Sequence, residues 1–122
     1  MPNPVVHFEI PADDMERLMR FYTDLFGWRM EAAPGMDDFA MVTTMTDGAG
    51  INGAIMKKRV PEQTIINYVM VASVADFADK LQKLGGMMVV PKTAVPGMGY
   101  FAVGLDPDHN PVGLWETDAN AG

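Results

Sequence analysis

Apolar side chains recur at helical spacing in two stretches of the chain. In the first stretch they occupy Met15, Leu18, Met19, Tyr22, Leu25 and Phe26. Residues three and four apart lie on the same side of a helix, so this spacing predicts a helix with one apolar stripe. Asp13, followed three residues later by Glu16, is the predicted N-terminal cap, and Gly27 is the predicted end of the helix.

The same pattern returns about sixty residues later, with Ser73 as the predicted cap and Gly85-Gly86 as the predicted end. The apolar stripe of this second helix comprises Val74, Phe77, Ala78, Leu81 and Leu84. One strand-like segment precedes each predicted helix and three follow it, separated by turn-forming clusters. The segments span residues 5–10, 28–33, 39–46 and 51–57, and then 64–72, 87–90, 100–105 and 112–117. The sequence therefore predicts an α+β fold, a single domain of two tandem βαβββ modules at residues 1–60 and 61–122.

Alternation along the strands predicts which side chains share a face of each sheet. The residues predicted to face the helices are Val6, Phe8, Ile10, Val69 and Val71, and those predicted to face away are Val5, His7, Glu9, Tyr68 and Met70. A sheet with a helix on one face only leaves its other face to cover itself or to bind a ligand. We therefore expect the two mixed sheets to curl into a shared cup lined by the second set.

Composition narrows the class of protein. The chain has 122 residues, of which 48% are apolar and none is cysteine, which suits one globular domain without disulfides or thiolate metal sites. No apolar run is long enough to span a membrane. The N-terminus lacks the basic and apolar segments of a signal peptide, so we expect a cytoplasmic protein.

The distribution of charge argues against nucleic acid as a partner. The formal net charge is −7, and nine Lys and Arg are spread along the chain without forming a basic face. The short run Lys57-Lys58-Arg59 comes between a predicted strand and a proline, which favours a solvated strand end. His109 lies in a predicted turn after Asp106-Pro107, and histidine is among the residues tolerated at positive φ.

Distinctive short segments occur in both halves of the chain. In the first half they are Val6-His7-Phe8-Glu9-Ile10, Phe21-Tyr22 and Leu25-Phe26-Gly27-Trp28. In the second half they are Leu84-Gly85-Gly86, Pro96-Gly97-Met98-Gly99-Tyr100-Phe101, Asp106-Pro107 with Asn110, and Gly113-Leu114-Trp115-Glu116. In this order and spacing they resemble the glyoxalase-like proteins of the vicinal oxygen chelate superfamily, to which bleomycin resistance proteins and dioxygenases also belong.

The resemblance implies a cup that binds a small molecule and is often completed in a homodimer. In metal-dependent members, the first and last strand of each module each direct one ligand into the cup. Carried onto this sequence, these positions are His7, Met56, Tyr68 and Glu116. His7 and Glu116 keep ligand chemistry, whereas a phenol and a thioether are poor ligands for hard or borderline metals. We therefore expect a divalent metal (zinc, nickel, manganese or iron) to be weakly bound or absent.

Two functions remain open at this point. The first is a glyoxalase-like enzyme, a lyase or isomerase acting on a small oxygenated metabolite, with Glu116 as base or ligand and His7 as ligand or acid. The second is a metal-free protein that binds or sequesters a small molecule, such as an antibiotic, by apolar and aromatic contact. The residues predicted to contact the ligand in either case are Glu9, Met56, Tyr68, Met70 and Leu114.

Overall fold

The computed structural model describes residues 3–33, 35–44 and 47–122, and these form eight strands and two helices. The chain divides into two compact units, His7–Ile65 and Met1–Val6 with Ile66–Gly122, called here the N-terminal and C-terminal modules. The boundary falls at Ile65, a few residues later than the sequence predicted, and the first residues of the chain belong with its second half. The order βαβββ occurs twice, as predicted, so the fold class is confirmed.

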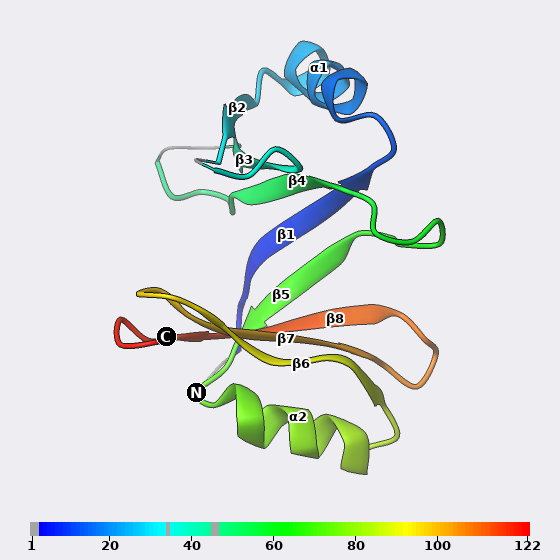
Figure 1. Ribbon diagram of the computed structural model, residues 1–122, viewed down its shortest axis with the longest axis vertical. Helices are drawn as coiled ribbons and strands as arrows, with labels where there is room; N and C mark the ends of the chain where they lie inside the picture. Colours follow the sequence, from blue (N-terminus) through cyan, green and yellow to red (C-terminus); the bar gives the residue numbers. More distant parts are fainter. Residues whose placement is uncertain (1–2, 34, 45–46) are drawn as a thin grey trace. The chain divides into compact units, whose positions relative to one another are not determined.

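The N-terminal module is a mixed four-stranded sheet with one helix. Its elements are β1 (Val5–Ala12), α1 (Met15–Phe26), β2 (Arg29–Ala32), β3 (Phe39–Thr43) and β4 (Gly53–Lys57). The strand order is β2-β3-β4-β1, and β1 pairs parallel to β4 whereas the other pairs are antiparallel. The helix α1 lies on one side of this sheet (Figure 1). The core between them contains Ile10, Ala12, Val42 and Ile55, with Phe8 and the α1 residues Met15, Leu18 and Met19 packed against it.

The C-terminal module repeats this arrangement. Its elements are β5 (Ile66–Met70), α2 (Val74–Lys83), β6 (Met87–Val95), β7 (Gly99–Leu105) and β8 (Pro111–Thr117), with the strand order β5-β8-β7-β6. Here β5 and β8 are parallel and the other pairs antiparallel. The helix α2 runs along one side of the sheet (Figure 1). The core under α2 contains Val71, Val74, Ala102 and Leu114, with Val69 and Phe77 packed against it.

Each sheet therefore has a helix face, which packs against its own helix, and an open face on the opposite side. The predicted helix-facing residues Phe8, Ile10, Val69 and Val71 all pack in the helix-side cores. Because successive strand residues alternate between faces, His7 and Glu9 lie on the open face of the N-terminal module. Tyr68 belongs to a separate cluster with Ile66 and Val103, on the open face of the C-terminal module.

The first helix begins one residue later than predicted. Asp14, not Asp13, is the N-cap, because Met15 is the first helical residue and the amide of Arg17 reaches back to Asp14 Oδ1 at 3.1 Å. Asp13 instead pairs with Lys58, 3.3 Å from its ammonium. The predicted stop at Gly27 is confirmed, with φ of 74°. The predicted cap Ser73 is also confirmed, since its hydroxyl accepts the amide of Asp76 at 3.2 Å.

Other differences from the predicted elements are small. The strand β6 continues to Val95, well beyond the predicted residue 90, and β3 ends at Thr43. The end of the predicted segment 39–46 falls on residues 45 and 46, which lie outside the described residues. His109 adopts φ of 67° in the turn between β7 and β8, which confirms its predicted turn role. Among the described residues, neither helix has the length and apolar character needed to cross a membrane.

Candidate functional site

The open face of the N-terminal module carries an acid–base pair. His7 and Glu9 are two residues apart on β1, so both side chains leave the strand on the same side. His7 Nε2 lies 3.6 Å from Glu9 Oε2, and the side chains are 30% and 15% exposed. An imidazole beside a carboxylate can gain and lose a proton near neutral pH, which suits either proton transfer or binding of a polar group.

The two modules correspond at an offset of 59 residues. The caps Asp14 and Ser73 are 59 residues apart, and so are Ile55 and Leu114, which occupy the two helix-side cores. The alignment of Gly53 with Gly113 used in the sequence analysis is therefore displaced by one residue. Since neighbouring strand residues point to opposite faces, this displacement changes the predicted face of every residue it matches.

Glu116 lies on the helix face and is bound to the start of α2. It follows Leu114 by two residues and pairs with Tyr100, and both of these pack toward α2. The amide of Val74, the first residue of α2, donates to Glu116 Oε1 at 2.9 Å. A carboxylate at this position satisfies one of the amides that a helix start leaves without a partner, and it favours the positive end of the helix dipole. The structure therefore assigns Glu116 a capping contact that the sequence did not reveal.

The open face of the C-terminal module is apolar and aromatic. The ring of Tyr68, which is 6% exposed, lies over Gly113, where an added Cβ would come 2.4 Å from a ring carbon. Tyr68 and Phe101 meet edge to face with centroids 6.5 Å apart. Trp115 is directly opposite Phe101 in the β7–β8 pair. Met70, 39% exposed, ends the same face of β5.

Leu114 does not share this face. It is 5% exposed and packs with Val71 and Val74 under α2, so the prediction that it contacts a ligand beside Tyr68 is wrong. Trp115, its neighbour, takes that place instead, and sequence reasoning missed it. The signal was present in the strand alternation, because Gly113 and Trp115 share a parity that Leu114 and Glu116 do not.

The donor set does not suit a chelated metal. Among residues 3–33, 35–44 and 47–122, no group of three or more His, Asp or Glu side chains is placed to hold an ion. Of the four predicted ligand positions, His7 has Glu9 beside it, whereas Glu116 is engaged by the start of α2. Two donors leave most of a coordination sphere unfilled. The residues present therefore do not fit the metal that the resemblance implies.

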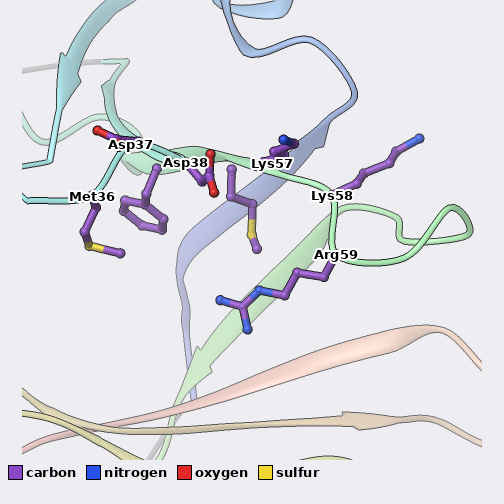
Figure 2. A pocket seen from close by; sticks show the side chains of 8 residues that line it. Met36, Asp37, Asp38, Lys57, Lys58 and Arg59 are labelled. Carbon is purple, nitrogen blue, oxygen red and sulfur yellow. The ribbon is translucent and has the colours of Figure 1, made fainter.

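A pocket of about 320 Å³ opens on the N-terminal module beside Met56. It is lined by residues 36–39, which lead into β3, and residues 56–59, which end β4 (Figure 2). Phe39 and Met56 are paired across the β3–β4 ladder, so they share the open face. Met56, predicted to contact a ligand, is 7% exposed and forms part of this wall.

The pocket collects charge as well as apolar surface. Lys57, Lys58 and Arg59 line it on one side and Asp37 and Asp38 on the other. In Figure 2 the side chain of Arg59 runs back toward the part of the pocket where Met36 lies, whereas Lys58 points away. The basic run expected to be a solvated strand end is thus in part a pocket wall. Sequence reasoning could not join it to residues 36–39, because the β3–β4 register had not been established.

Comparison with known proteins gives similarities over all or part of the chain. Residues 5–45 match the family model described as "Bleomycin resistance protein-like N-terminal". A protein of Mycobacterium bovis named "Putative glyoxylase CFP32" is 29% identical over 119 residues, which cover 93% of this chain and 46% of that protein. The chain therefore spans less than half the length of this relative. A "Glyoxylase-like domain-containing protein" of Didymella fabae is 32% identical over 83 residues, which cover 64% of this chain and 65% of that protein.

The fold also has solved counterparts. A glyoxalase/bleomycin resistance protein/dioxygenase superfamily member from Vibrio splendidus 12B01 matches with a TM-score of 0.67 and 12% identity, over 94% of this chain and 99% of that one. At this level of identity the match concerns the fold. It agrees with the two βαβββ modules and their mixed sheets.

Proposed function

Because this chain belongs to the glyoxalase/bleomycin resistance/dioxygenase superfamily, we propose that it binds a small apolar or aromatic molecule on the open faces of its sheets, without a chelated metal. The observation that carries this proposal is the use of Glu116. A side chain expected to be a ligand or base caps α2 from the helix face. The open face of the same module offers Tyr68, Phe101 and Trp115 instead.

Aromatic rings and thioethers suit such a ligand for physical reasons. Rings bury a large apolar area with few rotatable bonds, and methionine adapts its shape to an irregular partner. Met70 at 39% and Met41 at 44% exposure stand on open faces, where an unfilled apolar side chain gains most from contact with a ligand. The expected driving force is therefore burial of apolar surface, with no requirement for a metal.

The proposal can be tested with the uncharged fluorescent probe N-phenyl-1-naphthylamine. The Trp28→Phe variant leaves Trp115, on the open face, as the reporter tryptophan. We expect saturable binding with energy transfer from Trp115, and an affinity that is the same with EDTA or added zinc. Met70→Gln should weaken binding about fivefold to tenfold by removing apolar contact. Leu84→Gln, which changes an exposed residue at the end of α2, is the matched control and should leave the affinity unchanged. Binding that requires added metal contradicts the proposal.

The pair His7–Glu9 supports a second candidate function, an enzyme that moves a proton on a small oxygenated substrate. Glu9 would hold the imidazole of His7, and His7 would take or return the proton. The test is exchange of carbon-bound hydrogen next to the carbonyl in small 2-oxo acids, followed by proton NMR in D₂O. Exchange lost in His7→Ala and kept in His109→Gln would support the enzyme. Equal rates with and without protein would reject it for these substrates.

A further inference from the structure

We propose that the pocket beside Met56 binds the carboxylate end of a small apolar acid, and that Arg59 selects the charge of this ligand. The inference deepens the proposed function and rests on it, since it names the class of small molecule that would be bound. It is carried by three features of the pocket: an apolar seat, one cation directed to the pocket mouth, and two carboxylates on the opposite side.

The seat is formed by Phe39 and Met56. They are cross-strand partners on neighbouring strands, and Met36 lines the same pocket. A ring beside a thioether is a favourable surface for a flat or branched apolar group. The volume of about 320 Å³ lies at the small end of the range for ligand pockets, about 300–1,000 Å³. A ligand with one ring or a short branched chain fits this size.

Arg59 is positioned by the segment that follows β4. Its amide donates to Gln63 Oε1 at 2.8 Å, and the amide nitrogen of the Gln63 side chain lies 3.8 Å from Met56 Sδ. The backbone of Arg59 is therefore tied to the pocket wall. Its guanidinium is directed toward the side of Met36 (Figure 2) and forms no ion pair among the described residues. Lys58, in contrast, pairs with Asp13.

The charge pattern favours a carboxylate over other ligands. The chain carries a net charge of −7, yet three of its nine basic residues line this one pocket. The planar guanidinium can bind a carboxylate through two parallel hydrogen bonds. Asp37 and Asp38 lie across the pocket from the Arg59 guanidinium (Figure 2) and would repel a second negative charge. A singly charged acid therefore fits better than a phosphate dianion.

The test compares 3-phenylpropanoate with its neutral amide, 3-phenylpropanamide, by calorimetry on the full chain at neutral pH, with inorganic phosphate as a third ligand. We expect the acid to bind about tenfold more tightly than the amide, and phosphate not to bind. Arg59→Gln should remove this tenfold preference and leave the amide affinity unchanged. Lys58→Gln is the matched control and should keep the preference. Phe39→Leu should weaken acid and amide alike, with circular dichroism used to verify folding.

The outcomes separate this inference from the proposed function. Equal affinity for acid and amide in the unaltered protein overturns the role of Arg59, and so does an acid preference that survives Arg59→Gln. If neither compound binds while N-phenyl-1-naphthylamine does, the pocket is not the acid site although the binding function stands. If the naphthylamine probe also fails to bind, the proposed function itself is wrong.

Discussion

The open faces of the two modules differ in character although the modules share one topology. On the N-terminal module this face carries the His7–Glu9 pair and a charged pocket. On the C-terminal module it is occupied by Tyr68, Phe101 and Val103. The helix faces, in contrast, are alike, with aliphatic residues such as Ile55 and Leu114 at matching positions. The comparison teaches that the cores preserve the repeat, whereas the open faces have diverged in chemistry.

A second difference concerns two aromatic side chains that each cover a glycine. In the N-terminal module Phe8 pairs with Gly53, and in the C-terminal module Tyr68 pairs with Gly113. Phe8 packs against the helix-side core, whereas Tyr68 lies on the open face. The two pairs look equivalent in the sequence, but they are 60 residues apart in a repeat of 59. One residue of displacement puts the same pair of residue types on opposite faces.

The largest expected effect comes from adding a methyl group at these two glycines. At Gly53 a Cβ would lie 2.4 Å from the backbone oxygen of Phe8 and 2.5 Å from its ring, whereas at Gly113 it would meet only the ring of Tyr68. Because backbone cannot move as freely as a side chain, Gly53→Ala should cost about 3 kcal/mol of unfolding free energy and Gly113→Ala about 2 kcal/mol. Urea unfolding followed by tryptophan fluorescence measures both.

A double-mutant cycle sharpens this difference. In a Tyr68→Leu background the cost of Gly113→Ala should fall below about 0.5 kcal/mol, because the ring that it meets is gone. In a Phe8→Leu background Gly53→Ala should still cost about 2 kcal/mol, because the carbonyl oxygen of Phe8 remains. Equal rescue at both sites would show that the two pairs are equivalent after all.

A smaller effect is expected from Glu116 and its repeat equivalent, Lys57. Glu116→Ala removes the acceptor of the Val74 amide and should cost about 1–2 kcal/mol. Glu116→Gln keeps an acceptor and should cost about 0.5 kcal/mol, the loss of the charge at the helix start. Lys57→Ala, in the module whose helix is capped by Asp14, should change stability by less than about 0.5 kcal/mol.

Thermal unfolding with and without zinc distinguishes this capping role from metal binding. If Glu116 only caps α2, zinc should leave the unfolding temperature of the unaltered protein and of Glu116→Gln equally unaffected. A rise in the unaltered protein that disappears in the Gln variant would instead identify Glu116 as a ligand.

The helices and their order were predictable from the sequence because their signals are local. A cap, an apolar stripe and a glycine stop fall within about fifteen residues of each other, and Gly27 and Ser73 act as predicted. The helix faces of β1 and β5 followed from alternation in the same way. Asp13 was assigned in place of Asp14 because two adjacent aspartates offer the same acceptor, and only the first helical residue decides between them.

The site was less predictable because it depends on pairing between distant segments. Glu116 could be placed on a face only once β8 had been registered against β7, and its partner, the amide of Val74, belongs to another element. The pocket joins residues 36–39 to residues 56–59 through the β3–β4 register. No pattern within either segment indicates that pairing. Matching the glycines Gly53 and Gly113 by eye gave a repeat length that was one residue too long.

The smallest expected effect concerns the turns that occupy equivalent positions, Asp47 in the N-terminal module and Asp106 in the C-terminal module. Asp106 Oδ1 accepts the amides of Asp108 and Asn110, each at 2.9 Å, and Oδ2 accepts the side-chain amide of Asn110 at 3.0 Å. These hydrogen bonds, foremost those from Asn110, hold the pKa of Asp106 below its usual value. Asp47 accepts one amide, that of Ala49, at 3.3 Å.

The lowered pKa determines how stability should change with pH. A carboxyl group with a depressed pKa in the folded state stabilises the fold above its unfolded pKa, about 3.9, and loses that contribution as the pH falls through the folded pKa. Asp106→Asn should therefore be less stable than the unaltered protein at pH 7, and the difference should shrink as the pH drops below about 4. Asp47→Asn is the matched control, with a smaller difference at pH 7, because one amide depends on it instead of three donors. Urea unfolding at pH 7, 5, 4 and 3 measures both. A difference for Asp106→Asn that is independent of pH would mean that the hydrogen bonds of Asp106 do not depend on its charge. The contrast between the two turns would then rest on geometry alone.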